Sequence, residues 1–374
     1  MNGAQRLPFG ESAEQALERA TEFLRTARDA DGWWNDYEVR GPGQFWATAF
    51  VGASLAELPE GPGRSAAVSA WELLRQTRGP SDGWGYCPQV PGDADITSWV
   101  LRLAEALDAE DDPRADEGYR FVAAHLHEDG GISSYLPRIA APFLERVAPR
   151  WDAWYASHPC VTTAAAGLHG LPVRERLLTR LRELQRPEGS WPAYWWPDRE
   201  YPTALAAEAL TAGPSDEVPP EVSRAAGWAA ARIGEDGAVR TEWEPEGSAF
   251  ATAFALRTVL AGRSPQGRAA AARAASHLID AQEKDGSWRP SAWCRVPGPM
   301  EFDPDAREHW ERGLRGKAAL GSVVLDTKAL YTTASVVAAL ARTRTPETSS
   351  AAAPGGPGRT ARSAPRPDHE GDRW

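Results

Sequence analysis

A glycine-centred segment recurs six times along this 374-residue chain and constrains its fold more than any other feature. The clearest copies run from Leu181 to Trp191 and from Leu278 to Trp288, and both contain Gln followed by Gly-Ser-Trp. A fixed period of roughly 50 residues indicates a repeat architecture. The glycines that mark the six copies are Gly32, Gly83, Gly130, Gly189, Gly237 and Gly286.

Each copy is followed by a second segment that is rich in small residues and opens on a threonine. The six threonines are Thr48, Thr97, Thr162, Thr203, Thr252 and Thr333. A threonine hydroxyl can cap free N–H groups at a helix start, and apolar residues recur at helical spacing after it. Glycine tolerates the positive φ of a turn. Each repeat therefore predicts two helices. A closed ring of six inner and six outer helices explains better than a bundle why the second helix carries fewer charges.

Composition excludes several classes of protein. The net charge is −11, and acidic and basic residues are interleaved without a basic stripe, which argues against nucleic-acid binding. Hydrophobic residues make up 42% of the chain, ample for a core, and the repeats favour one domain over residues 13–342. The three cysteines do not imply a disulfide framework. Because the chain shows neither a signal region nor an apolar run of about 18 residues, we expect a cytoplasmic protein without a transmembrane segment.

Three stretches interrupt or follow the repeats. Residues 343–374 are rich in Pro, Gly, Ser and Arg, so we expect a disordered tail. Two long insertions, residues 135–157 and 289–328, lie between a turn and the following helix. Long loops in compact domains are usually functional or disordered. Because both insertions contain aromatic residues such as Trp151 and Trp310, we expect them to form lids.

The repeated segments resemble the QW motif, in which Gln precedes Gly-x-Trp. This motif marks the squalene–hopene cyclase and prenyltransferase β-subunit superfamily. The resemblance covers about residues 13–342, and it implies an all-α fold, the α/α six-barrel of about twelve helices. It constrains function less than fold, because one fold hosts many chemistries.

One position in the repeats carries a carboxylate among mostly aromatic residues. If the threonines mark equal heights, the residues two positions earlier form a ring at one rim of the barrel. In five repeats these residues are aromatic or Cys, and in one the residue is an Asp: Trp46, Asp95, Cys160, Tyr201, Phe250 and Tyr331. The plain interpretation of Asp95 is a helix N-cap, a common role for Asp. Thr97 could supply that cap instead.

A second acid, Asp93, lies two residues before Asp95. Burial and like charge both disfavour ionisation, so an acid pair in an aromatic cavity should retain a proton near neutral pH. Such a group can serve as a general acid. We therefore predict Asp95 as the catalytic acid and Asp93 as the residue that tunes it.

The segment from Asp93 to Ser98 resembles the Asp-x-Asp-Asp-Thr-Ala signature of class II terpene cyclases. In that family the middle Asp protonates an alkene and starts a carbocation cascade. The resemblance gives Asp95 this role and matches Asp93 to the first Asp, whereas Ile96 replaces the third. The related oxidosqualene cyclases have Asp-Cys-Thr-Ala, with the one acid at the position of Asp95.

Aromatic faces stabilise carbocations without supplying a nucleophile that would trap them. Trp99 lies one helical turn after Asp95 and should share its face. We predict that the aromatic residues of this region bind substrate: Trp46, Trp99, Tyr201, Phe250 and Tyr331. Core packing is the alternative for each, and it is the role expected for Trp191 and Trp288.

Two further residues are candidates for substrate contact or positioning. His158 could orient Asp95 through a hydrogen bond, although a loop histidine with other partners is a simpler interpretation. His158 and Cys160 also suggest a zinc site. The resemblance argues against one, because prenyltransferase β-subunits take their ligands from the last repeats. Arg102 lies two turns after Asp95 and could bind a diphosphate, although a surface charge is the commoner role.

We therefore predict a class II terpene cyclase that cyclises a linear isoprenoid without a cofactor, or with Mg²⁺ if the substrate is a diphosphate. The site could be complete in this chain or could require a protein partner. The alternatives are a non-catalytic module that binds an isoprenoid or a prenylated partner, and a zinc-dependent prenyltransferase-like protein.

Overall fold

The six repeats fold into six pairs of helices in the computed structural model, which describes residues 10–38, 41, 43–77, 82–212, 217–313 and 319–344. The first helices of the pairs form the outer layer: α1 (Gly10–Thr26), α3 (Pro62–Gln76), α5 (Pro113–Ala123), α9 (Arg174–Leu184), α11 (Pro220–Arg232) and α13 (Pro265–Asp280). The second helices form the inner layer: α2 (Gln44–Ala56), α4 (Ala94–Ala106), α8 (Pro159–Ala166), α10 (Glu200–Thr211), α12 (Ala249–Ala261) and α14 (Leu330–Ala341).

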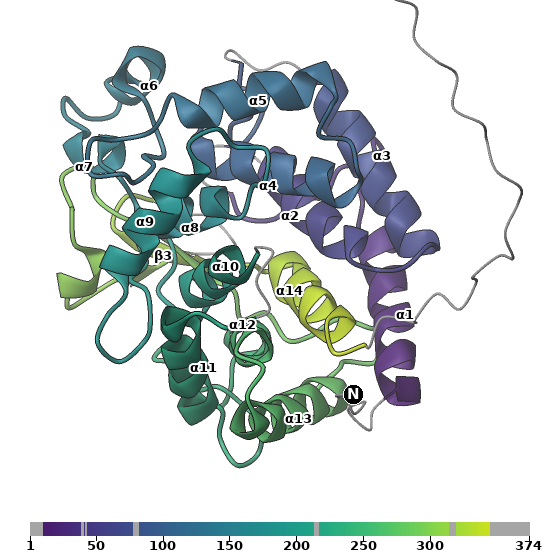
Figure 1. The fold of residues 1–374 in the computed structure, drawn as a ribbon. Coiled ribbons are helices and arrows are strands. Elements are labelled where there is room, and N and C mark those ends of the chain that lie inside the picture. Colours follow the sequence, from purple (N-terminus) through teal and green to yellow (C-terminus); the bar gives the residue numbers. More distant parts are fainter. Residues whose placement is uncertain are drawn as a thin grey trace, which may run out of the picture. The chain divides into compact units, whose positions relative to one another are not determined.

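The inner helices contact one another in chain order, and α14 returns to contact α2 (Figure 1). The predicted α/α six-barrel is therefore confirmed. Outer helices bury one stripe, whereas nearly every residue of α2, α12 and α14 is buried. This difference explains the low charge of the inner helices, because an ionised side chain without a partner is costly inside a core.

The repeated Trp and Gln residues hold the helix pairs together. In four repeats the indole N–H donates to the carbonyl ten residues earlier, near the end of the outer helix: Trp34, Trp84, Trp191 and Trp288. Gln282 donates to the carbonyls of Gly286 and Ala16, both at 2.9 Å. The second bond joins the last repeat to the first and closes the ring.

The repeated threonines act differently from the prediction. Thr97 lies inside α4, and its hydroxyl accepts a hydrogen bond from the amide of Trp84 at 3.0 Å. The corresponding hydroxyls of Thr203 and Thr252 accept from Trp191 and Val239. The threonines therefore tie each Gly turn to the next inner helix, and the expectation that Thr97 caps α4 is wrong.

The two insertions have structure of their own. The first contains two short helices, α6 (Pro137–Leu144) and α7 (Asp152–Tyr155). The second contains the 3₁₀ helix η1 (Pro304–Ala306) and a small sheet of β1 (Trp293–Val296), β2 (Glu311–Arg312) and β3 (Ser322–Leu325). Strand β3 pairs antiparallel with β1 and parallel with β2. The repeat pattern did not predict these strands, because the insertion lies outside the repeats.

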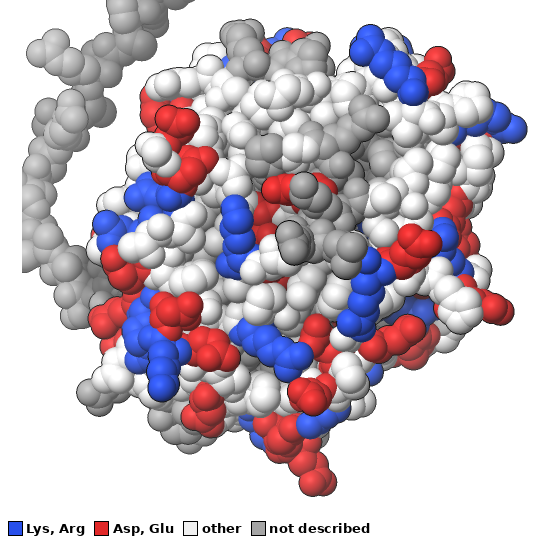
Figure 2. Space-filling model, turned by 180° about the vertical axis from the view of Figure 1, so that it is seen from behind, with Lys and Arg blue, Asp and Glu red and all other residues white. Residues whose placement is uncertain are grey.

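The described residues belong to one compact unit that ends at Arg344. The sequence predicts a disordered tail from residue 343, but Thr343 and Arg344 form a turn in which their amides donate to the carbonyls of Leu340 and Ala341. Residues 345–374 of the predicted tail lie outside those described. No helix in the described part of the chain is long and apolar enough to cross a membrane. On the face shown in Figure 2, positive and negative side chains are interleaved over the lower part.

Candidate active site

A cavity of about 360 Å³ opens where the inner helices begin. Its wall combines the start of α4 with both insertions. Trp151 and Trp154 of the first insertion and Cys294 and Val296 of the second line the same space as Asp95. The amide of Ala153 and the indole of Trp154 donate to carbonyls of the second insertion at 3.1 Å. Both insertions therefore lie over the rim that carries Asp95, which is the position expected of lids.

Asp93 and Asp95 lie in this wall, and they have different surroundings. Asp93 is the N-cap of α4, because one of its carboxyl oxygens accepts a 2.8 Å bond from the amide of Ile96. Asp95 follows within the first helical turn, and its Oδ1 is buried without a hydrogen-bond partner. The capping role therefore belongs to Asp93, and the carboxyl of Asp95 remains available to a ligand.

Both acids hold their protons more tightly than ordinary carboxyls. Burial raises the pKa of Asp95 from its ordinary value of 3.8 to about 7. Burial also raises the pKa of Asp93 well above its ordinary range, and the nearby charge of Asp95 adds to this effect, although backbone N–H groups oppose it. An acid with a pKa near 7 can be protonated at neutral pH and still release its proton, as a general acid requires.

The predicted aromatic residues are close together, but most do not line the cavity. Trp46 lines it and lies 4.9 Å, between ring centroids, from Tyr331. Tyr201 and Phe250 are fully buried and stack on Trp196 with centroids 4.6 and 5.0 Å apart. Trp99 is also buried, and its indole donates to the hydroxyl of Tyr201 at 3.0 Å.

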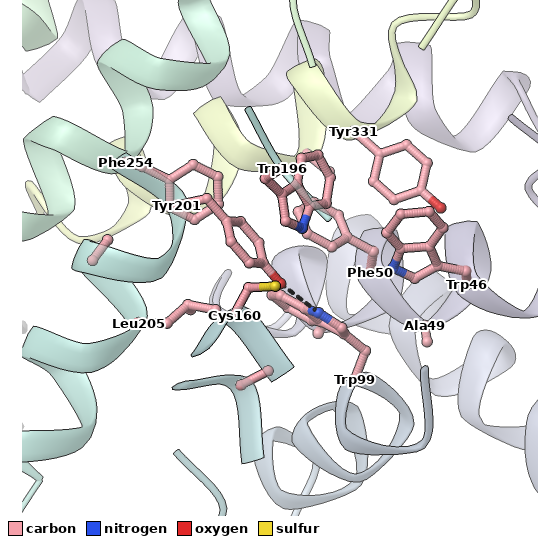
Figure 3. Packing of buried hydrophobic residues seen from close by; sticks show 14 of the residues in the cluster. Trp46, Ala49, Phe50, Trp99, Cys160, Trp196, Tyr201, Leu205, Phe254 and Tyr331 are labelled. Atoms are coloured by element: carbon pink, nitrogen blue, oxygen red, sulfur yellow. Dashed lines mark hydrogen bonds between the residues drawn. The ribbon is translucent and has the colours of Figure 1, made fainter. Parts of the chain in front are cut away.

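These residues form an aromatic floor, which we define as Trp46, Trp99, Trp196, Tyr201, Phe250 and Tyr331. Figure 3 shows all of them except Phe250 as labelled side chains. The expectation that Trp99, Tyr201, Phe250 and Tyr331 line an open cavity is corrected, because their large rings fill the barrel axis. The sequence analysis did not identify Trp196, because this residue lies on the segment between α9 and α10 and has no counterpart in the other repeats.

His158 does not reach Asp95. Its Nδ1 lies 2.8 Å from the hydroxyl of Ser134, and its Nε2 lies 2.8 Å from the carbonyl of Ala153. Its ring stacks on Tyr194 with centroids 3.8 Å apart. The predicted contact with Asp95 is therefore wrong. Both ring nitrogens are occupied, and the described residues contain no group of three or more potential metal ligands.

Arg102 lies in the barrel interior, away from the cavity. Seven residues after Asp95, it is carried roughly 10 Å along α4 by the helical rise. Its guanidinium donates to the carbonyl of Ala164 at 3.2 Å, lies 3.8 Å from Glu208, and covers the ring of Trp99. The predicted role in diphosphate binding is therefore corrected. Two helical turns keep Arg102 on the same face of α4 as Asp95, but they also move its side chain down the barrel axis and away from the cavity.

Arg295 is the cation that lines the cavity in the described part of the chain. Its side chain is 4% exposed, and all of its nitrogens donate to protein atoms. The acceptors are the carbonyls of Ala193 and Tyr194 and the carboxylate of Asp305, which lies 2.8 Å away. This residue therefore joins the second insertion to the segment that carries Trp195.

Comparisons with known proteins agree with this geometry. Residues 162–303 match the family model of the squalene-hopene cyclase C-terminal domain. No curated protein matches the chain. A solved structure of a protein from Actinoplanes is 46% identical, with a TM-score of 0.83, over 88% of this chain and 99% of that one.

Type II terpene cyclase MstE from Scytonema is similarly close. Its structure with geranylgeranyl dihydroxybenzoate, the substrate, is 36% identical over 90% of this chain and 98% of that one, with a TM-score of 0.83. Its structure with merosterolic acid A, the product, is also 36% identical to this chain with a TM-score of 0.83, and the match covers 99% of that structure's chain. The chain therefore belongs to the type II terpene cyclases, within the superfamily of the squalene–hopene cyclases.

Proposed function

We propose that this protein cyclises a linear prenyl chain that is attached to an aromatic acid, and that Asp95 supplies the initiating proton. The proton would pass from the Asp95 carboxyl to the terminal double bond of the chain. The resulting tertiary cation would then be attacked by the next double bond, which closes a ring. Loss of a proton would complete the reaction, so the product is an isomer of the substrate.

The observation that carries this proposal is the state of Asp95. Its carboxyl lies in the wall of an aromatic cavity, it has an oxygen without a partner, and burial raises its pKa to about 7. Asp93 performs the structural task of capping α4. A neutral carboxylic acid in such surroundings can donate its proton to a weakly basic alkene.

The surroundings of Asp95 suit the cation that would follow. Trp46, Trp151, Trp154 and Trp195 line the same cavity and offer ring faces or edges to a passing positive charge. A cation over an aromatic face is stabilised by about 0.5–2 kcal/mol per contact. The other residues of the aromatic floor, which pack behind Trp46, would extend this environment into the barrel.

The substrate class rests on the relatives. MstE from Scytonema is solved with geranylgeranyl dihydroxybenzoate and with merosterolic acid A. The cavity volume of about 360 Å³ lies within the usual range for sites that bind small molecules. The proposed reaction needs no cofactor, and Mg²⁺ would matter only for a diphosphate.

The test is incubation of the purified protein with geranylgeranyl dihydroxybenzoate in the absence of added metal. We expect a product of unchanged mass that has lost one or more double bonds and gained rings. Geranylgeranyl diphosphate, with and without Mg²⁺, provides the comparison. If the protein binds these compounds but converts none of them, a non-catalytic isoprenoid-binding module becomes the better interpretation.

A further inference from the structure

We propose that Ser134 and His158 form the base that removes the proton at the end of the cyclisation, an inference that rests on the proposed function. The pair lies next to the acid but shares no hydrogen bond with it. Ser134 lines the cavity. Its carbonyl accepts a 2.9 Å bond from the amide of Ala94, the residue immediately before Asp95.

The hydrogen bonds of the pair fix the direction in which a proton can move. His158 Nε2 lies 2.8 Å from the carbonyl of Ala153, which can only accept, so this nitrogen carries the hydrogen. His158 Nδ1 is then the acceptor and takes the hydroxyl hydrogen of Ser134 at 2.8 Å. The indole of Trp195 donates to the same hydroxyl oxygen at 2.8 Å. A hydroxyl oxygen has two acceptor sites, so one remains for a ligand.

This arrangement provides a complete path for the departing proton. A C–H bond beside the cationic carbon breaks, and its electron pair forms the new double bond. The proton passes to the Ser134 oxygen while the hydroxyl hydrogen of Ser134 moves to His158 Nδ1. The imidazolium that results donates from Nε2 to the Ala153 carbonyl, and the positive charge has moved from the substrate to His158.

The environment suits a base that must coexist with a protonated acid. Burial lowers the pKa of His158 to about 3, so the ring is neutral under conditions in which Asp95 is still protonated. A carbocation is a very strong acid, so a weak base is sufficient to deprotonate it. The ring of Tyr194, stacked 3.8 Å from His158, stabilises the transient imidazolium.

The difference between the pKa values of Asp95 and His158 also explains how the starting protonation state is regenerated. After the reaction the Asp95 carboxylate has a pKa of about 7, whereas the imidazolium has a pKa of about 3. Return of the proton from His158 to Asp95 is therefore downhill. The environments drive the pKa values of the two groups in opposite directions, as expected for an acid and a base of one reaction.

Substitution of Ser134 provides the sharpest test, because it breaks the path and keeps the backbone bond to Ala94. The matched control is Ser133→Ala, since the Ser133 hydroxyl donates to the carbonyl of Tyr135 at 3.1 Å and does not belong to the proposed proton path. The probe is geranylgeranyl dihydroxybenzoate. The measurement is the distribution of products, compared between wild type and variants after each has consumed the same amount of substrate. His158→Phe, which keeps the stacked ring, is the second variant.

In Ser134→Ala and His158→Phe we expect the share of the wild-type olefin, relative to other olefins and water-trapped alcohols, to fall at least about tenfold. Ser133→Ala should give the wild-type mixture. An unchanged mixture and rate in Ser134→Ala overturns the assignment even if His158→Phe fails to fold. Failure of the proposed function is recognised separately, because wild-type protein would then convert no prenyl substrate.

Discussion

A carboxyl oxygen of Asp93 accepts a hydrogen bond of 2.8 Å from the amide of Ile96, and this bond separates the tasks of the two acids at the cavity. Asp93 holds the start of α4 through one oxygen and has its second oxygen buried without a partner, and Asp95 has an unpartnered oxygen in the first turn but no capping bond. The proposed chemistry depends on this separation, because the Asp93 oxygen that accepts from Ile96 is committed to the start of the helix, whereas burial alone raises the pKa of Asp95.

The cap predicts different effects of two substitutions at Asp93. Asp93→Ala removes the acceptor and should lower the free energy of unfolding by about 1 kcal/mol, the usual loss for an N-cap. Asp93→Asn retains an oxygen for the Ile96 amide and should be close to wild type. Urea unfolding monitored by circular dichroism measures both. Equal stability of all three proteins would contradict the capping role of Asp93.

The raised pKa of Asp95 predicts the direction of the pH dependence. The protonated acid is the active form, so cyclisation should be steady below pH 7 and fall roughly tenfold per pH unit well above it. The raised pKa also fixes the direction in which the free energy of unfolding changes with pH. A pKa raised by folding contributes most to stability below the ordinary value of 3.8, and this contribution is lost as the pH rises towards 7.

The stability of the wild type relative to Asp95→Asn should therefore decrease between pH 4 and 7. Rates over pH 5–9 and urea unfolding at each pH test the two statements independently. A rate that rises through pH 7, with the fold intact, would mean that the ionised form of Asp95 is required.

The far end of the barrel carries a charge network that should affect stability and leave the product unchanged. Glu208 accepts two bonds of 2.8 and 2.7 Å from Arg257 and also pairs with Arg342 and Arg102. Glu208→Gln would remove the shared carboxylate and should cost about 3 kcal/mol.

The matched control is Glu60→Gln, because Glu60 forms an ion pair with Arg64 at the surface. This exposed pair should contribute less than about 1 kcal/mol. The products of Glu208→Gln should be those of the wild type. A changed product with unchanged stability would place the network in the substrate site and restore the role first expected for Arg102.

The contacts between the insertions predict coupled movement. Trp154 lines the cavity, donates to the carbonyl of Pro297 at 3.1 Å and packs edge-on against Trp195. Trp154→Ala should therefore accelerate proteolytic cleavage in both insertions, and a bound isoprenoid should slow cleavage in the wild type. Phe302→Ala is the control, since this side chain is 59% exposed. If Trp154→Ala affects the first insertion alone, the insertions open independently.

The fold could be predicted from the sequence because most repeats form the same short-range hydrogen bonds between the Gly turn and the outer helix. The indole of Trp191 reaches back to Leu181, and Gln282 reaches Ala16 across the closure of the ring. These contacts need only a regular spacing, which a sequence displays directly. The position of Asp95 was predictable for the same reason, since it shares a register with Trp46.

Side-chain direction was harder to predict. Register gives the height of a residue in the barrel, but it does not show which residues fill the axis and which leave a cavity. Tyr201 and Phe250 are buried in the aromatic floor because Trp196 stacks on both, and Trp196 belongs to an irregular segment. His158 bonds Ser134 for a similar reason, since the insertion sets its direction.

Turnover by Asp95→Asn is the most direct test of the proposed mechanism. The substitution keeps size and hydrogen-bonding capacity, so the melting temperature at about pH 4, where ionisation of Asp95 in the unfolded wild type contributes little, should remain close to that of the wild type. Loss of the dissociable proton should reduce cyclisation of geranylgeranyl dihydroxybenzoate by at least about 10²-fold, the lower end for a general acid. A folded Asp95→Asn protein with wild-type turnover would contradict the assignment of Asp95 as the initiating acid.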